Sequence, residues 1–235
     1  MPVRTRKVKP RYNLETVGGK EYKMYPSRFI DGRSAIHVSD HMTGKMLNVP
    51  SISTSCLDNP FCKARLENGI GICAHCFAET TLKMRPTVRR NMTDNFNLLT
   101  GEVLPEEVLP QFKPETEIVR LESFGDVYNE TQCVNYLHIV RKNPHAFFSV
   151  WTKNPKVWER ALAKTPKPQN LNIVISSQEI NCQTEKVPDF ADVVFTVYTK
   201  DKPESEINCG ARSCDACRAC YRKYQELKIV NEHLK

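Results

Sequence analysis

The sequence lacks long apolar runs. No stretch approaches the roughly 18 consecutive apolar residues that a membrane-spanning helix needs, and residues 1–11 contain no apolar stretch like that of a secretory signal. We therefore expect a cytoplasmic protein that makes no contact with membranes. The sequence also has no internal repeat and no low-complexity tract, which excludes repeat architectures.

Acidic residues are absent from residues 1–11. This arm carries five basic residues, Arg4, Arg6, Lys7, Lys9 and Arg11, in a chain of 235 residues whose net charge is +7. The rest of the chain is therefore nearly neutral. A basic arm is typical of contact with nucleic acid or another polyanion, or of a solvated terminus, and we favour the solvated terminus.

Cysteine, in contrast, is abundant, with ten residues. In a reducing cytoplasm, clustered cysteines hold metal more often than they form disulfides. Eight of them form two groups, which we predict to be metal ligands: Cys56, Cys62, Cys73 and Cys76, and then Cys209, Cys214, Cys217 and Cys220. Of the other two, we expect Cys133 to be a small core residue and Cys182 to lie near the functional site.

The spacing of the second group is the more diagnostic. Its Cys-x4-Cys-x2-Cys-x2-Cys pattern is similar to the run that holds iron–sulfur clusters in bacterial ferredoxins. Four thiolates can close around a [4Fe–4S] cluster or around tetrahedral zinc, and we favour the cluster because no histidine joins the group. The first group, Cys-x5-Cys-x10-Cys-x2-Cys, predicts a cluster or a structural zinc site.

Strand and helix patterns alternate through the middle of the chain. Apolar strands are predicted at residues 46–53, 117–121, 146–151, 171–175 and 193–197, with helices after Pro86, Asn129 and Asn154. This order predicts an α/β fold with a parallel sheet. We expect a partial or irregular parallel (β/α) barrel with a Cys-rich, metal-binding C-terminal extension, and an open doubly wound sheet is the alternative.

Three regions follow from these patterns. Residues 1–45 form the basic arm and short β elements, with turns at Gly18-Gly19 and Asp31-Gly32. Residues 46–200 form the partial barrel with the first cysteine group. Residues 201–235 contain the second cysteine group and are predicted to end in a helix.

Polar residues follow each predicted strand. Because the carboxyl ends of parallel strands carry the site in α/β folds, we expect these residues to gather at one mouth. Glu122, Asp126 and Lys153 are the candidate catalytic residues. Those expected to bind a cofactor are Ser123, Gly125, Asp126, Ser176 and Ser177.

Several segments then resemble a known family. They are CFA at residues 76–78, PTV at 86–88, NFNL at 95–98, RLESFGD at 120–126, NP at 143–144, FFSVWTKNP at 147–155 and the terminal cysteine run. Together they resemble the gene product 88 family of phages and mobile elements, over roughly residues 45–222. This resemblance implies a phage-encoded protein in the cytoplasm of its host.

The architecture is also similar to that of radical S-adenosylmethionine enzymes. Those enzymes have a partial barrel and a three-cysteine [4Fe–4S] cluster after the first strand. The similarity implies that Glu122, Gly125 and Asp126 meet the methionine part of S-adenosylmethionine, that Ser176 and Ser177 contact the same cofactor, and that residues 209–220 hold an auxiliary cluster. The family's Cys-x3-Cys-x2-Cys motif is incomplete, since residue 69 is Gly, so Cys62 or Cys56 becomes the third ligand.

Three functions remain open. The first is a redox or radical enzyme with one or two [4Fe–4S] clusters, an unknown substrate and an electron donor. The second is a zinc-stabilised nucleic-acid-binding or regulatory protein that uses the arm and a second basic patch formed by Lys83, Arg85, Arg89 and Arg90. The third is a non-catalytic, cluster-bearing scaffold that binds a host protein.

Overall fold

The main sheet has six parallel strands that pair in chain order. The computed structural model describes residues 12–40, 42–201, 206–210 and 212–234, so the basic arm at residues 1–11 lies outside the described residues. The strands are β4 (Ser51–Ile52), β5 (Ile118–Leu121), β6 (Phe147–Thr152), β7 (Leu171–Ser176), β8 (Val193–Tyr198) and β9 (Lys228–His233).

This strand order decides between the two predicted architectures. A doubly wound sheet reverses its strand order in the middle, whereas here every strand lies beside its predecessor. In the described residues β4 does not pair with β9, so the sheet does not close into a barrel. The fold is therefore a mixed α/β structure built on an open, singly wound parallel sheet.

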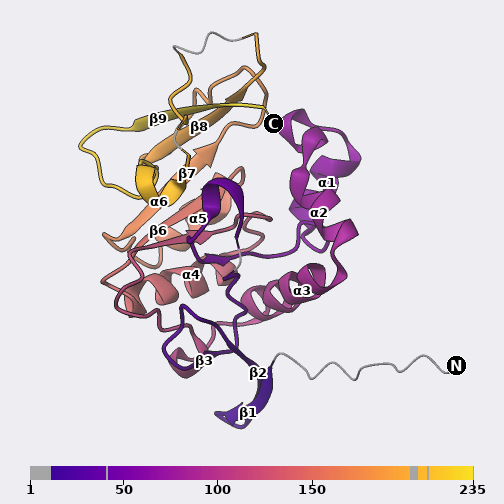
Figure 1. The fold of residues 1–235 in the computed structure, drawn as a ribbon, viewed down its shortest axis with the longest axis vertical. Helices are drawn as coiled ribbons and strands as arrows, with labels where there is room; N and C mark the ends of the chain where they lie inside the picture. The colour runs from indigo at the N-terminus through magenta and orange to yellow at the C-terminus, as the bar shows by residue number, and fades with distance from the viewer. Residues whose placement is uncertain (1–11, 41, 202–205, 211, 235) are drawn as a thin grey trace, which may run out of the picture.

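A smaller sheet precedes the main one. It is antiparallel and contains β1 (Asn13–Val17), β2 (Lys20–Pro26) and β3 (Arg33–Ser34). Gly18 and Gly19 connect β1 to β2 with φ values of 56° and 80°, which glycine adopts without steric cost. The predicted short β elements and this turn are confirmed. Figure 1 shows the hairpin at the opposite end of the molecule from β8 and β9.

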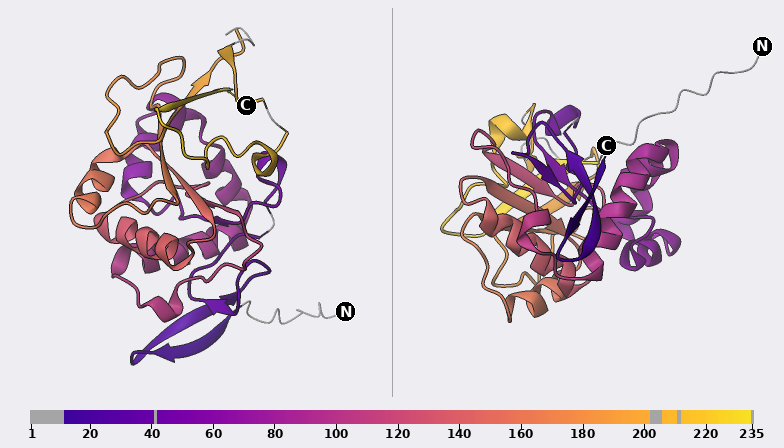
Figure 2. Two further views of the ribbon diagram at one scale, coloured as in Figure 1. Left: turned by 90° about the vertical axis from the view of Figure 1, so that its left-hand side faces the viewer. Right: turned by 90° about the horizontal axis from the view of Figure 1, so that it is seen from below.

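The helices lie in the connections between strands. Three of them separate β4 from β5: α1 (Pro60–Glu67), α2 (Phe77–Met84) and α3 (Pro86–Gly101). Then α4 (Glu130–Lys142) follows β5, α5 (Pro155–Leu162) follows β6, and the four-residue α6 (Cys214–Cys217) precedes β9. Short 3-10 turns are η1 (Gly44–Met46), η2 (Gly71–His75) and η3 (Glu106–Val108). Figures 1 and 2 both show α1–α3 to one side of the sheet. None of the helices in the described residues is long and apolar enough to span a bilayer.

The two faces of the main sheet are covered differently. One face packs against α4 and α5 and forms the largest apolar core, in which Trp158 and Tyr136 are fully buried against strand residues such as Phe148. We call the opposite surface the cysteine face. There, Val174, Val193 and Val230 pack against Cys209 and Cys220 of the cysteine-rich segment, residues 209–221.

Two sequence predictions about secondary structure were wrong. The strand predicted at 46–53 is only the two-residue β4, preceded by the turn η1. The final helix of residues 201–235 is instead strand β9, which pairs with β8 along its whole length. Its β-branched Ile229 and Val230 suit a strand, and pairing with a distant strand is not visible in local sequence.

Candidate functional site

The first cysteine group gathers at the carboxyl edge of the main sheet. Cys56 follows β4, Cys62 lies in α1, Cys73 lies in η2, and Cys76 is the N-cap residue of α2. The side chains of Cys56, Cys62 and Cys76 pack in one apolar cluster. Cys56 is hydrogen-bonded to Cys76, and Cys62 interacts electrostatically with Cys73. Three of the four predicted ligands therefore lie in one cluster, and Cys73 lies outside it in η2.

The two members of the Cys56–Cys76 pair are not equivalent. The hydrogen bond from Cys56 lowers the pKa of the Cys76 thiol to about 6, assisted by the backbone N–H groups of Glu79 and Ala78 at the start of α2 and by the charge of Lys153. The same hydrogen bond and burial raise the pKa of Cys56. Cys76 is thus the more acidic thiol of the pair, and thiolates are the form that binds metals.

A cation contacts Cys73. Arg65 in α1 donates from Nε to the Cys73 sulfur at 3.3 Å and from one terminal nitrogen to Gln178 at 2.9 Å. The backbone carbonyl oxygen of Gln178 accepts a hydrogen bond from the backbone N–H of Ile72 at 2.9 Å. A Cβ atom on Gly71 would lie only 2.1 Å from that carbonyl oxygen, so glycine permits this close approach. These contacts join the first cysteine group to the loop that follows β7.

Glu122, a predicted catalytic residue, is 2% exposed and accepts several hydrogen bonds. Thr54 donates from its hydroxyl at 2.9 Å and from its backbone N–H at 3.2 Å. Gln132 donates at 2.7 Å, and the Tyr136 hydroxyl also donates. Burial nevertheless raises the pKa of Glu122 to about 7. The carboxylate joins the end of β4 to α4.

Asp126 is also buried, and its carboxylate accepts hydrogen bonds from the end of β6. The Thr152 hydroxyl donates to it at 2.6 Å, and the backbone N–H of Lys153 donates at 2.7 Å. Burial raises its pKa, against the opposing effect of the Lys153 charge. Asp126 thereby fixes the backbone from which the Lys153 side chain extends beside Cys62 and Cys76.

The other predicted cofactor-binding residues lie at the same edge. The Ser123 hydroxyl forms 2.8 Å hydrogen bonds with those of Ser51 and Ser53. A Cβ atom on Gly125 would lie 2.7 Å from the Thr54 carbonyl oxygen, so this segment packs directly on the backbone that follows β4. Ser176 ends β7, and the adjacent Ser177 hydroxyl bonds with Thr196 at 2.9 Å.

The second cysteine group lies elsewhere, on the cysteine face. Cys209, Cys214, Cys217 and Cys220 interact electrostatically with one another. All ten cysteines are free thiols; Cys133 is buried, and Cys182 is exposed in the loop after β7. Within the described ranges, no three or more His, Cys, Asp or Glu side chains form an arrangement that could hold a metal ion as it stands.

Sequence reasoning missed three cations beside the cysteines. Arg120 interrupts the apolar strand β5, and a lone charge in a buried strand was a usable signal. Lys45 and Arg65 approach cysteines from separate segments, and no local pattern could have identified them.

Comparison with known proteins gives one match. A family model described as Gene product 88 matches residues 20–226. No curated protein and no solved structure matches the chain significantly. The similarity to radical S-adenosylmethionine enzymes therefore has no support from these comparisons.

Proposed function

Because the chain belongs to the phage gene product 88 family, whose name specifies no chemistry, we propose its function from the carboxyl-edge site. The protein is an iron–sulfur redox or radical enzyme whose cluster is held by Cys56, Cys62, Cys73 and Cys76. Its substrate enters at the carboxyl edge of the sheet.

One observation carries this proposal. Three thiols from three segments, Cys56, Cys62 and Cys76, pack together beside the strand ends of a parallel sheet, which is where α/β enzymes bind ligands. Cys73 lies nearby in η2, where Arg65 of α1 donates to its sulfur. Four cysteine thiolates are the ligands that [4Fe–4S] clusters use, so these four residues have the donor atoms that such a cluster needs.

The neighbouring side chains have supporting roles. A cluster held there would supply one electron to a substrate or to S-adenosylmethionine. Arg65 donates to the Cys73 sulfur, and the Lys153 charge acts on Cys62 and Cys76, so these cations offset thiolate charge. Asp126 acts as a positioning residue, since it holds the Lys153 backbone. Lys153 can also attract an anionic substrate.

Metal and acid-labile sulfide analysis of anaerobically purified protein tests the proposal. We expect iron with matching sulfide and a visible spectrum that bleaches with dithionite. Cys76→Ser should remove the iron and sulfide held by the first cysteine group. Cys182→Ser changes an exposed cysteine outside both groups and should keep them. Equal iron and sulfide in the two variants would contradict the proposal.

The role of S-adenosylmethionine needs its own measurement. We expect addition of the compound to the reduced protein to change its electron paramagnetic resonance spectrum, and Gly125→Ala to abolish that change. An unchanged wild-type spectrum would remove S-adenosylmethionine from the proposal and leave a redox protein.

One observation favours a second candidate function. Lys83, Arg85, Arg89 and Arg90 are exposed around the junction of α2 and α3. A zinc site formed by the same four cysteines would stabilise this basic patch, which fits a nucleic-acid backbone. Zinc without sulfide, together with salt-dependent binding of DNA that an Arg85→Ala/Arg89→Ala variant loses, would favour this function.

A further inference from the structure

The second cysteine group covers the cysteine face instead of the mouth. We propose that Cys209, Cys214, Cys217 and Cys220 hold a separate metal centre with four thiolate ligands, and that Arg120 is its buried counter-ion. This centre is independent of the carboxyl-edge site. It takes an iron–sulfur cluster or zinc, both of which accept four cysteines.

Arg120 provides the first evidence. Its guanidinium stacks on the Trp151 ring from the neighbouring strand β6. Its Nε atom is buried and has no hydrogen-bond partner among the described residues. The groups that act most strongly on its charge are Tyr221, to which the guanidinium is also hydrogen-bonded, and the cysteines Cys220 and Cys214. A buried cation needs an opposite charge, and thiolates of a metal centre supply it.

Lys45 provides a second cation, beside Cys209. Its ammonium lies 3.6 Å from the Cys209 sulfur and donates to the Cys209 carbonyl at 2.6 Å. It also pairs with Glu232 at 2.8 Å. A zinc ion or an oxidised [4Fe–4S] cluster with four thiolates has a net charge of about −2. Two flanking cations suit such a charge.

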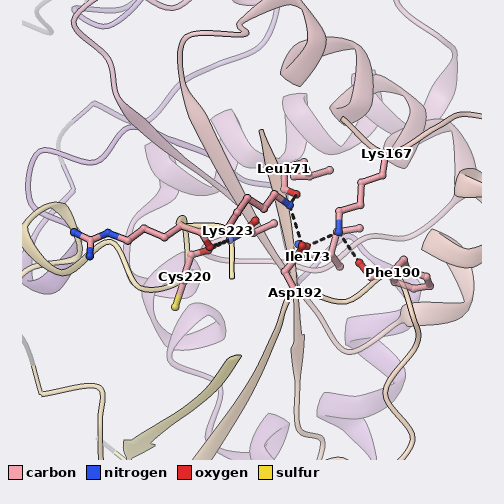
Figure 3. A network of polar contacts seen from close by, with 9 residues as sticks. Lys167, Leu171, Ile173, Phe190, Asp192, Cys220 and Lys223 are labelled. Atoms are coloured by element: carbon pink, nitrogen blue, oxygen red, sulfur yellow. Dashed lines mark hydrogen bonds and ion pairs between the residues drawn. The ribbon is translucent and has the colours of Figure 1, made fainter. Parts of the chain in front are cut away.

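Hydrogen bonds anchor the end of the cysteine-rich segment to the main sheet (Figure 3). Asn172 in β7 donates to the carbonyl of Cys220 at 3.1 Å and to that of Arg222 at 2.8 Å. Lys223 donates to the Leu171 carbonyl at 2.6 Å and pairs with Asp192. The backbone around Cys220 is therefore fixed to the sheet from both sides.

The ligand side chains themselves can adjust. All four cysteines are only partly buried, and Cys214 and Cys217 lie one turn apart in α6, whose N-cap is Ser213. Cys220 packs in one apolar cluster with Cys214 and in another with Cys209.

The first experiment measures metal per chain in the full-length protein. We expect Cys217→Ser and Cys76→Ser each to lose a different part of the bound metal and the double variant to lose both parts. Loss in Cys76→Ser alone, with Cys217→Ser equal to wild type, would overturn this inference and leave the carboxyl-edge proposal standing. Loss of metal in Cys217→Ser alone, with Cys76→Ser equal to wild type, would uphold this inference and contradict the carboxyl-edge proposal. Iron with sulfide identifies a cluster, and zinc without sulfide identifies a zinc site.

The second experiment isolates the counter-ion. We expect Arg120→Met to release the metal of this centre to a chelator about tenfold faster than wild type, and Arg120→Lys to restore slow release because it keeps the charge. Arg222→Met is the matched control, since Arg222 is exposed two residues beyond Cys220. Equal release rates in Arg120→Met and Arg120→Lys, with both proteins folded by circular dichroism, would disprove the role of Arg120.

Discussion

The Lys223 ammonium lies 2.9 Å from one oxygen of the Asp192 carboxylate and so joins the chain just after the cysteine-rich segment to the start of β8. The other oxygen of Asp192 accepts from the backbone N–H of Ile173 at 2.8 Å and pairs with Lys167 at 2.5 Å. One carboxylate thus connects three segments, and only 17% of its side chain is exposed.

Removing this carboxylate should therefore destabilise the protein markedly. Asp192→Ala leaves the partly buried Lys167, the exposed Lys223 and one strand N–H without their acceptor, and we expect a loss of about 2–4 kcal/mol in unfolding free energy. Urea denaturation followed by circular dichroism measures it. Glu130→Ala is the control, because Glu130 pairs with the exposed residues Arg160 and Lys164, and this change should destabilise the protein much less than Asp192→Ala.

Glu122 should make stability depend on pH. Its pKa is raised by burial from 4.5 to about 7, so ionisation is harder in the folded state than in the unfolded state. Stability should therefore fall as pH rises from about 4.5 to about 7, by about 3 kcal/mol. Wild type and Glu122→Gln should be compared by urea denaturation at pH 5 and pH 8.

The comparison isolates the effect of Glu122 because Asp126, a second buried carboxyl group with a raised pKa, is present in both proteins. We expect Glu122→Gln to be less stable at pH 5, where it loses hydrogen bonds, and to lose less stability than wild type between the two pH values. Parallel pH profiles would show that Glu122 ionises normally in the folded protein.

Gly125→Ala should disturb the segment that follows β5. The new Cβ atom would lie 2.7 Å from the Thr54 carbonyl oxygen and 2.8 Å from a Glu122 carboxylate oxygen. Because the carbonyl belongs to the backbone, the segment must shift, at a cost of about 1–3 kcal/mol. Gly101→Ala is the control at the end of α3, where a Cβ atom has open space, and its melting temperature should stay equal or rise slightly.

Asn129→Ala should weaken the start of α4. The Asn129 side chain accepts from the backbone N–H of Gln132 at 3.0 Å and donates to the Thr100 carbonyl at 2.9 Å. Loss of this cap should lower unfolding free energy by about 1–2 kcal/mol. Asn154→Ala, at the N-cap of α5 but without a side-chain capping bond, should have the smaller effect in the same thermal or urea measurement.

These two caps illustrate how far the sequence predicts the fold. Apolar strands, capping residues and prolines identify most of the main sheet and helices α3, α4 and α5, because those signals are local. The strand that contains β4 was predicted too long, and the terminal β9 was predicted as a helix, since pairing with a distant strand defines each of them. The same pairing order shows that the sheet is singly wound, which strand patterns alone left undecided.

The candidate site, like the fold, was predicted only where the signal lies in local sequence. Cysteine spacing predicts two groups, and their positions at the mouth and on the cysteine face are set by packing between remote segments. Glu122 and Asp126 were predicted from their place after β5, but the donors that surround them come from Thr54, Gln132 and Thr152. Such partners are found only when the chain is folded.

The sequential winding of the sheet has a consequence for biosynthesis. Strand β8 pairs along its full length with β9, which lies at residues 228–233. Until those residues leave the ribosome, β8 is an uncovered edge with free backbone N–H and carbonyl groups. Such edges recruit other strands. A chain that stops before Lys228 would therefore retain β8 as its edge strand, whereas in the longer chain β9 covers β8 and becomes the edge strand of the open sheet.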